Sequence, residues 1–537
     1  MSMAIMVMAT VKNINKVMPA KALLFFLLAP ASVIAGEWTF EPNIGLTETY
    51  TDNVELTPNK QQSSLVSQIF IGLDTDYNSR YFDFSFSGTE TYAAYSHDSD
   101  VNDDFQEASL NTRLLLGDTG FQLIASSEIN NISQNDADNS LADLVSGDTI
   151  QQQMHTGGIQ YQANNSDFIV DSSLTYNLIE TEDNIGESQG YSFDLTSQNG
   201  LSARTVFWQI EGEYDQRENN EFSGKAYNIE GKIGAITSYR FNPFIRVYDE
   251  DVKGNVQGAN NSNIPSIGPG IRWLPSRHLF IDLAYNFIQE DTTATDDYIS
   301  ASIHWTPSER TTLKADYSQR FYGDSYGFDF SHRNKRLTNS IVYVETIEAF
   351  DRSTFEETDL GIFYCPASVD LTELSPSDCY AENSDINQPN DYILAGFSSI
   401  SPVENNEFTL NKRLTWTSIL TLRRTTFTFN AGTREREALS SGIIDTYFDV
   451  SFDINRKTSA HSDISFNARY SENTYDKENT EGSEQDDKYR VASATYNRTL
   501  AHSLSGFISL QYVDRESSRN DRTYQEARAS INITKDF

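Results

Sequence analysis

The chain has 537 residues, and its 77 acidic and 40 basic side chains give a formal net charge of −37 at pH 7. This charge argues against a nucleic-acid partner, because neutralising phosphates requires basic patches. From Trp38 to Phe537 the composition is uniform, with short aromatic-rich runs separated by Asn, Asp, Ser and Gly. That uniformity favours one large β-structure over several small domains.

Residues 1–35 have the pattern of a secretory signal peptide. Three lysines precede the apolar run ALLFFLLAPASVIA, which ends in small residues that fit a cleavage site. The run is shorter than the roughly 20 residues that a membrane-spanning helix needs. We therefore expect the mature chain to begin at Gly36, and translation to start at Met1 or Met18. Removing three lysines leaves 37 basic and 77 acidic residues, a net charge of −40.

The mature sequence is a series of segments in which apolar and polar residues alternate. Examples are HLFIDLAYNF (278–287), TLKADYSQRF (312–321), DTYFDVSFDIN (445–455) and SDISFNARY (462–470). A period of two residues predicts β-strands with one apolar and one polar face. The mature chain has no apolar run long enough for a spanning helix, so any membrane insertion would use strands.

The connections between these segments alternate in length. Tight turns such as GDTGF, LPSRH and TPSER alternate with long polar links such as SQNDADNSLADLVSGD and ENTYDKENTEGSEQDD. A soluble propeller has no reason to alternate in this way, whereas transmembrane barrels have short periplasmic turns and long extracellular loops. We predict an all-β fold over residues 36–537, a transmembrane antiparallel β-barrel of about 24 strands (range about 18 to 26). Its expected location is the outer membrane of a Gram-negative bacterium.

Aromatic residues mark the predicted membrane boundary and the chain end. Trp273 and Trp305 occur in IRWLPSR and IHWTPSER, each beside a tight turn, which fits an interfacial aromatic belt. The last segment, ARASINITKDF, ends in Phe537. We expect the outer-membrane barrel assembly machinery to recognise this terminal strand, although Lys535 departs from the usual apolar residue.

The longest irregular region, residues 351–405, contains both cysteines of the chain, Cys365 and Cys379. In an exported protein we expect a local disulfide between them, which would stabilise the region by roughly 3 kcal/mol. A metal site is not expected, because no histidine is nearby to complete a tetrahedral set. The region is either an extracellular surface loop or a constriction loop folded into the lumen.

The polar faces of the predicted strands carry charges of both signs. They would give a wet lumen a charge-tuned selectivity, or they would simply pair and stabilise the wall. The predicted lumen-facing residues are Arg272, Asp282, Lys314, Asp316, Arg320, Asp445, Asp449, Asp453, Asp463, Arg469 and Arg528. We expect a strongly acidic lumen to oppose anionic polymers, so that neutral or cationic cargo would pass more easily.

One motif raises the possibility of an enzyme. The sequence GDSYG around Ser325 matches the G-x-S-x-G nucleophile elbow. The elbow requires a helix after the serine, but period-two segments flank this motif on both sides. We therefore interpret it as a hairpin turn. No catalytic residue, metal site or cofactor is predicted, and an outer-membrane hydrolase that uses Ser325 is the rival class.

Two stretches resemble a known family. WTFEPNIGLTETYTDNVEL is similar to the first strand of the PEP-CTERM system-associated outer-membrane proteins, related to putative β-barrel porins of exopolysaccharide operons. GPGIRWLPSRHLFIDLAY and the following IHWTPSER to IVYVET segment are similar to that family's central hairpins. The resemblance implies a porin-like conduit linked to exopolysaccharide export. Outer-membrane lipid, lipopolysaccharide and periplasmic polysaccharide-export proteins would be its partners. The alternative is a non-conducting barrel that docks envelope export machinery.

Overall fold

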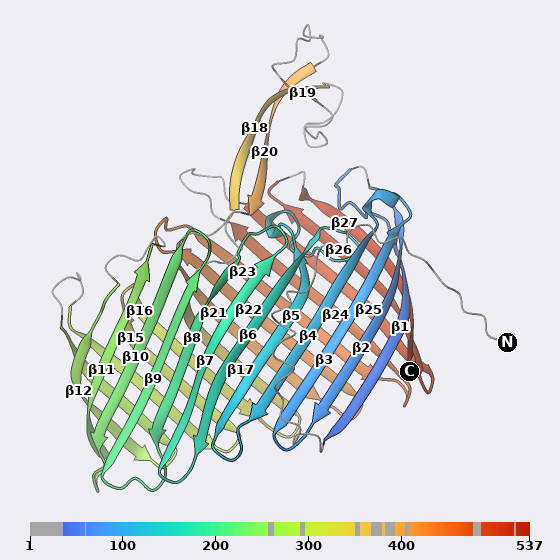
Figure 1. Cartoon of the computed structure of the whole chain (residues 1–537). Coiled ribbons are helices and arrows are strands. Elements are labelled where there is room, and N and C mark those ends of the chain that lie inside the picture. The colour runs from blue at the N-terminus through green and yellow to red at the C-terminus, as the bar shows by residue number, and fades with distance from the viewer. Residues whose placement is uncertain are drawn as a thin grey trace.

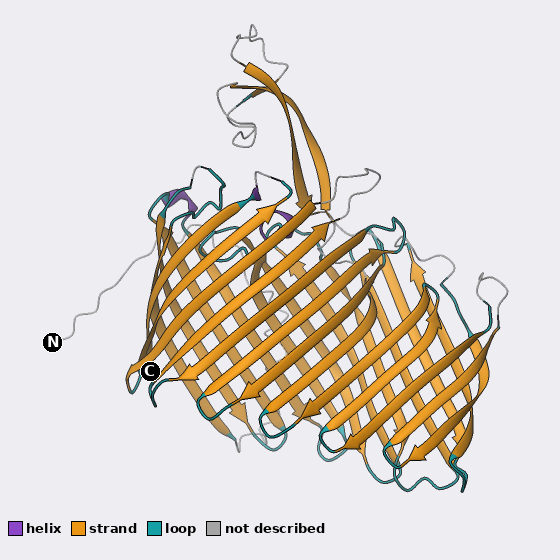
Figure 2. Cartoon of the chain, turned by 180° about the vertical axis from the view of Figure 1, so that it is seen from behind, coloured by secondary structure: helices purple, strands orange, loops and turns teal. Residues whose placement is uncertain are grey.

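The alternating segments form one closed antiparallel sheet of 24 strands, as the computed structural model shows (Figures 1 and 2). Each barrel strand pairs with its neighbours along the chain, β17 pairs with β21 across an insertion, and β27 pairs with β1 to close the ring. The predicted fold class and strand number are confirmed. Closure removes every sheet edge, as the hydrocarbon core of a membrane requires.

The structure describes most of the mature chain. The described residues are 36–59, 61–255, 262–289, 296–348, 355–366, 379–381, 392–402, 407–475, 485–519 and 522–537. The predicted signal peptide lies outside them. Within these ranges, no helix has the length and apolar character needed to cross a membrane.

The barrel strands are 10 to 17 residues long, enough for a tilted strand that needs roughly 9–11 residues to span the membrane. They are β1 (Glu37–Thr51), β2 (Ser64–Asn78), β3 (Phe82–Tyr95), β4 (Asp103–Leu115), β5 (Phe121–Ser133), β6 (Thr149–Asn164), β7 (Phe168–Thr181), β8 (Ser188–Asn199), β9 (Val206–Glu218), β10 (Ser223–Ala235), β11 (Phe241–Gly254), β12 (Ser266–Ser276), β13 (Leu279–Ile288), β14 (Tyr298–Ser308), β15 (Thr311–Arg320), β16 (Gly323–Arg333), β17 (Leu337–Glu348), β21 (Thr409–Thr421), β22 (Thr425–Ala438), β23 (Ile444–Lys457), β24 (Ser462–Tyr475), β25 (Gln485–Ala501), β26 (Leu504–Ser517) and β27 (Tyr524–Asp536). The remaining elements are the short helices η3 (Ser99–Val101) and α2 (Asp136–Asn139) and the strands β18 (Phe355–Pro366), β19 (Tyr380–Ala381) and β20 (Tyr392–Pro402).

The two ends of the barrel differ in their connections. At the end that also carries the C-terminus, which we call the short-turn end, no connection is longer than residues 200–205 (Figure 1). The opposite, long-loop end carries residues 134–148 and 349–408. The predicted alternation is not strict, because the long-loop end also has tight turns such as residues 321–322 between β15 and β16.

The outward face of the barrel is an apolar band with aromatic residues at both margins. Near the short-turn end, the exposed rings of Trp273 and Phe241 stack with their centroids 6.3 Å apart, and Trp305 is also exposed. Near the long-loop end, Tyr317 and Tyr326 lie 5.5 Å apart between ring centroids. A continuous exposed apolar band with two aromatic margins fits a protein surface that contacts lipid.

The two tryptophan turns share a local irregularity. In β12 the pairing with the next strand shifts register between Trp273 and Ser276, and in β14 it shifts after Trp305. These shifts leave Pro275 and Pro307 without register partners. Because proline has no backbone N–H to donate to a ladder, such unpaired positions suit it.

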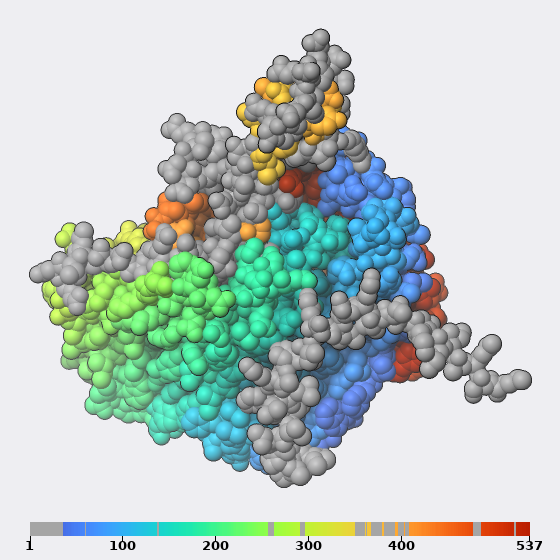
Figure 3. Space-filling view, turned by 45° about the horizontal axis from the view of Figure 1, so that its top comes forward, coloured from blue at the N-terminus to red at the C-terminus, as the bar shows by residue number. Residues whose placement is uncertain are grey.

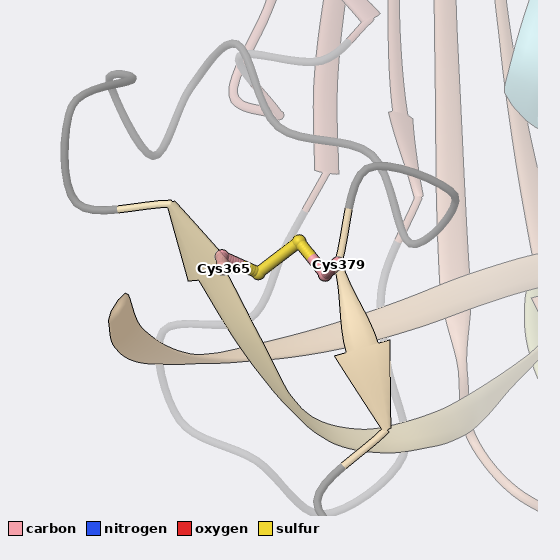
Figure 4. Close-up of a disulfide and its surroundings, with 2 residues drawn as sticks. All are labelled: Cys365 and Cys379. Atoms are coloured by element: carbon pink, nitrogen blue, oxygen red, sulfur yellow. A yellow bond between two sulfur atoms is a disulfide. The ribbon is translucent and has the colours of Figure 1, made fainter. Parts of the chain in front are cut away.

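The insertion between β17 and β21 forms a sheet of its own. Strands β18, β19 and β20 pair with one another and project away from the long-loop end (Figures 1 and 3). A disulfide joins Cys365 to Cys379, whose Cα atoms are 4.5 Å apart (Figure 4). The described part of region 351–405 therefore lies outside the lumen.

Because this hairpin makes no ladder with the barrel, its removal should leave the barrel intact. We expect a protein that lacks residues 351–405 to keep its heat-modifiable mobility on unboiled gels. As a matched control, removing β21 and β22 (residues 409–438) deletes two strands of the ring and should abolish that mobility. A hairpin deletion that fails to fold would show that the ring depends on the projecting sheet.

Candidate functional site

The connection between β5 and β6, residues 134–148, folds into the barrel, and we call it the inward loop. The hydroxyl of Tyr95 on β3 donates to the carbonyl oxygen of Leu144 at 2.6 Å. The backbone N–H of Ser140 donates to the hydroxyl oxygen of Tyr489 on β25 at 3.4 Å. Since Tyr95 and Tyr489 are buried side chains of separate parts of the wall, these contacts hold the loop against the inside of the barrel.

An ion pair between a buried arginine and a partly exposed acid adds a third anchor to the inward loop. Arg528 of β27, one of the predicted lumen-facing residues, pairs with Asp143 of the loop. The same guanidinium donates to Glu526 at 2.5 Å. Val145 of the loop packs in an apolar cluster with Val66 of β2. Charged and apolar contacts therefore fix the loop to β27 and β2, the two neighbours of β1 in the ring.

The last residue of the inward loop is an acid in a partly buried position. Burial raises the pKa of Asp148, and the nearby Arg522 guanidinium opposes this effect. A raised pKa means that the folded state favours the neutral acid. The ionisation of Asp148 therefore opposes loop docking as the pH rises through the folded-state pKa.

Three arginines on β21, β22 and β24 face the inward loop, and we call Arg413, Arg434 and Arg469 the arginine patch. They line one cavity of about 420 Å³ together with Asp136 and Leu141 of the loop. A second cavity of about 480 Å³ continues past Arg469 and Leu141 toward β25 and β26. The loop and this wall thus bound a polar space inside the barrel.

The arginine patch breaks a rule of strand pairing. Arg413 and Arg434 are directly opposite each other in the β21–β22 register, an arrangement of like charges that destabilises a sheet. Among the described residues, neither Arg413 nor Arg469 has an ion-pair partner, and Arg434 lies over the ring of Tyr447, 4.1 Å from its centroid. This cation–π contact offsets only part of the repulsion between the two arginines, and a local conflict of this kind is expected at functional sites.

Acidic residues line the wall about halfway around the ring from the arginine patch. Asp194 of β8 is opposite Glu213 of β9 in register. Asp194 accepts a hydrogen bond from Ser173 at 3.1 Å, and Glu213 accepts one from Asn228 at 3.1 Å. Glu211 and Asp215 follow the same alternation on β9; together with Asp194 and Glu213 we call them the acidic wall. By the order of strands in the closed ring, β8 and β9 lie about opposite β21 to β24, so the acidic wall and the arginine patch are on opposing sides of the lumen.

The inside of the barrel between β10 and β15 is filled by one buried polar network. Arg246 of β11 is 2% exposed. Its guanidinium donates to Glu230 at 2.6 and 3.0 Å, to Asn286 and Tyr298 at 3.1 Å each, and to Ser318 at 3.4 Å. These partners come from β10, β13, β14 and β15, so a single side chain ties together most of this side. We call it the filled side.

Several of the predicted lumen-facing residues form further ion pairs on the filled side. Arg320 donates to Glu250 at 2.7 Å. Arg272 forms a two-pronged contact with Asp282 at 2.7 and 2.8 Å, and the Lys232 ammonium lies 3.7 Å from the same carboxylate. On this side the charges pair with one another and stabilise the wall, which is the structural alternative considered for them.

The other predicted lumen-facing residues also lie on inner positions. Asp445 pairs with the Arg436 guanidinium at 3.2 Å, Asp453 accepts from Asn467 at 2.6 Å, and Asp463 accepts from Asn497 at 2.9 Å. Lys314 is opposite His304 and Asp316 is opposite Gly327 in register. Asp449 lies in the cavity of the arginine patch.

Ser325 does not occupy a turn, which corrects the sequence interpretation. The turn is Phe321–Tyr322, and Ser325 is a buried residue of β16. β16 and β17 form ladder pairs only from Phe328 onward. Before that point, side chains bridge the two strands: Ser325 donates to Glu345 at 2.7 Å and Tyr322 donates to Glu345 at 3.0 Å. Ser325 thus helps to join β16 to β17 where the backbone ladder between them is missing.

We expect Ser325→Ala to leave conductance unchanged and to lower the free energy of unfolding by about 1 kcal/mol. The loss is small because Tyr322 and Tyr343 still donate to Glu345, at 3.0 and 2.8 Å. Single-channel recording and thermal unfolding of the purified variant check the two parts. Loss of conductance in a folded S325A protein would contradict this prediction and support the hydrolase interpretation.

The end of the chain completes the ring. The backbone N–H of Phe537 donates to the carbonyl oxygen of Pro42 on β1 at 2.9 Å. Its ring is 72% exposed, and the ammonium of Lys535 lies 5.4 Å from the ring centroid. An exposed terminal aromatic next to the closing strand is available for recognition during assembly. Among the described residues, no group of three side chains is arranged to hold a metal ion.

Comparisons with known proteins found structural similarity only. No protein-family model matches the chain, and no curated protein matches its sequence. A double mutant of the ferric enterobactin receptor PfeA of Pseudomonas aeruginosa matches with 7% identity over 93% of this chain and 80% of that chain, at a TM-score of 0.40. OpdK of Pseudomonas aeruginosa, solved with vanillate, matches with 6% identity over 93% and 99%, at 0.35. The FrpB iron transporter of Neisseria meningitidis (F3-3 variant) matches with 8% identity over 93% and 81%, at 0.42. Values this low carry no argument about function, and the fold rests on the strand pairings above.

Proposed function

We propose that this protein is a porin-like conduit of the Gram-negative outer membrane, linked to exopolysaccharide export in a PEP-CTERM-type system. One observation carries the proposal. The barrel interior is packed between β10 and β15, whereas polar cavities of about 480 and 420 Å³ lie between the inward loop and the β21–β26 wall. A polar space beside an inward-folded loop is the arrangement that limits and selects solutes in a wide barrel.

A third cavity supports a path along the same wall. It has a volume of about 770 Å³ and lies near the short-turn end, lined by residues such as Thr47, Asp463, Asn497 and Asn532. Hydroxyl and amide side chains of this kind bind water and neutral solutes. The three cavities therefore follow the inner surface of β22 to β27 from one end toward the other.

The export link rests on the sequence resemblance to barrels of exopolysaccharide operons. On that basis, the proposed partners are outer-membrane lipid and lipopolysaccharide, the barrel assembly machinery and periplasmic polysaccharide-export proteins. Polysaccharide-synthesis genes beside this gene would support the link. A neighbourhood without them, together with normal exopolysaccharide secretion in a deletion strain, would count against it.

Conductance in planar bilayers tests the conduit itself. We expect discrete current steps from the purified full-length protein, because the polar cavities leave space for water and ions on one side of the lumen. No current above leak, both in the intact protein and after excision of the inward loop, would instead favour the non-conducting docking barrel. Fractionation with outer membranes and heat-modifiable mobility establish that the protein tested is folded and correctly located.

A further inference from the structure

The arginine patch holds more positive charge than the described chain around it balances. Its cavity contains Arg413, Arg434 and Arg469 against Asp449 and Asp136. Asp449 makes no ion pair with any described residue, although it shares the cavity with the arginines. By contrast, the neighbouring Arg436 is 3% exposed and pairs with Asp445. The wall therefore contains one arginine in a buried ion pair and three arginines that line the cavity without an ion-pair partner among the described residues.

A purely structural role explains these three arginines poorly. Solvated arginines on an outer surface need no partner, but Arg413 and Arg434 lie opposite each other on the inner face and repel. Gly432 is the next inner residue on β22, and a Cβ there would come within 2.9 Å of the Asp449 carboxylate. The absence of a side chain at this position makes room for the Asp449 carboxylate inside the cavity of the arginine patch.

We propose that the arginine patch binds the carboxylate groups of acidic saccharides in the lumen. This inference rests on the proposed function and names the substrate class of the same site. Guanidinium groups bind planar carboxylates through two parallel hydrogen bonds. Two adjacent arginines could each bind the carboxylate of one of two successive sugar units. They could also bind a single carboxylate together, one from each side.

The rest of the cavity lining has the chemistry that sugar hydroxyls require. Asp449 offers carboxylate oxygens that accept from hydroxyls, and Ser471 and Asn473 offer polar side chains. Tyr447 and Tyr475 line the same cavity with their rings 5.9 Å apart and nearly perpendicular. Aromatic surfaces with a few convergent polar groups are typical of sites for sugars and other small ligands.

This assignment changes the expectation that an acidic lumen excludes anionic cargo. The net charge of the chain is −37, but exposed charges more than about 8 Å apart are screened at physiological salt. An anion at the patch therefore experiences the three arginines more than the acidic wall across the lumen.

Calorimetric titration of the folded, detergent-solubilised full-length protein tests the proposal without requiring conduction. Three probes are compared: a galacturonate hexamer, the galacturonate monomer and maltohexaose, a neutral hexamer. The test variant is R413Q/R434Q, and the matched control is K488Q/R490Q, which removes two cations that pair with Glu472, Asp514 and Glu516. R469Q is a second, milder test variant if the double variant does not fold.

We expect the acidic hexamer to bind more tightly than the monomer, and maltohexaose to show no binding. The dissociation constant of the hexamer should rise roughly tenfold or more in R413Q/R434Q and stay unchanged in K488Q/R490Q. Equal binding of both hexamers, equal loss in both double variants, or no binding at all would overturn the proposal. Binding of the monomer as tight as that of the hexamer would assign the patch to small carboxylic acids instead of polymers.

Planar-bilayer recording separates this inference from the proposed function. If the acidic hexamer binds and wild-type protein conducts, the hexamer should reduce the current at lower concentration in the wild type than in R413Q/R434Q. If the protein conducts but the hexamer neither binds nor blocks, the conduit stands and the acidic-saccharide site fails. If the hexamer binds and no current is seen, the site stands and the conduit fails.

Discussion

Replacing residues 137–147 of the inward loop with a short Gly-Ser link is expected to raise the single-channel conductance several-fold. The loop lies inside the barrel on Tyr95, Tyr489 and Arg528. Barrels of about 16–18 strands already leave an aqueous channel, so a 24-stranded ring without its inward loop should conduct far more. The measurement is the unit current of purified variant and wild-type protein in the same lipid and salt.

The projecting hairpin supplies the matched control for the loop replacement. Deleting residues 351–405 also removes a long segment from the same end, but β18 and β20 lie outside the ring. α2 contacts β20, yet the hydrogen bonds that fix the loop to the wall are independent of the hairpin. Conductance should therefore change little in this deletion. A large increase in conductance after the hairpin deletion, with no increase after the loop replacement, would show that the hairpin and not the inward loop constricts the lumen.

Arg246→Met is expected to lower the free energy of unfolding by about 3–5 kcal/mol. Arg246 is the hub of the filled side, and its loss removes five hydrogen bonds to Glu230, Asn286, Tyr298 and Ser318, with Lys232 as the remaining cation beside Glu230. Methionine conserves much of the side-chain volume, so the change tests the charge and hydrogen bonds more than packing. Denaturant unfolding of the barrel in lipid vesicles measures the loss.

Arg490→Met is the control for this prediction. Arg490 also contacts two acids, Asp514 at 2.6 Å and Glu516 at 2.9 Å, but its side chain is 50% exposed. An exposed pair of this kind contributes about 0–1 kcal/mol. Equal, small losses in R246M and R490M would show that the filled side is not a structural network.

The strands and their faces were predictable because side-chain direction alternates strictly along a strand. Arg272 lies between Ile271 and Trp273, and Asp282 between Ile281 and Leu283. Once the apolar neighbours are assigned to lipid, both charges must face inward, and the structure places them as partners at 2.7 Å. The partner itself was not predictable, because pairing needs the register between two strands as well as the period within each.

The inward loop could not be identified from its own sequence. Its polar composition suits a solvated loop equally well, and its anchors Tyr95, Tyr489 and Arg528 are distant in the chain. Region 351–405 was the more obvious candidate because it is longer and contains a disulfide. Length alone did not decide which segment enters the lumen.

The arginine patch was recognised only in part. Arg469 follows a clean alternation, but Arg413 stands beside Lys412, a charge on the outward face that interrupts the apolar pattern. The Lys412 ammonium lies 2.7 Å from the Glu435 carboxylate and 3.2 Å from the Glu437 carboxylate, so an ion cluster replaces lipid contact there.

Ser325 was assigned to the turn because the glycines of GDSYG suggested one. The turn between β15 and β16 needs only two residues, and both glycines belong to β16.

The central claim is that ions pass between the inward loop and the β21–β24 wall and not through the filled side. Thiol modification during conductance recording tests it directly, because both native cysteines are in the disulfide. Thr415 is exposed in the cavity of the arginine patch, whereas Ser300 is 8% exposed within the filled side. A charged methanethiosulfonate reagent should reduce the current of T415C and leave that of S300C unchanged. Current loss in S300C with none in T415C would contradict the account.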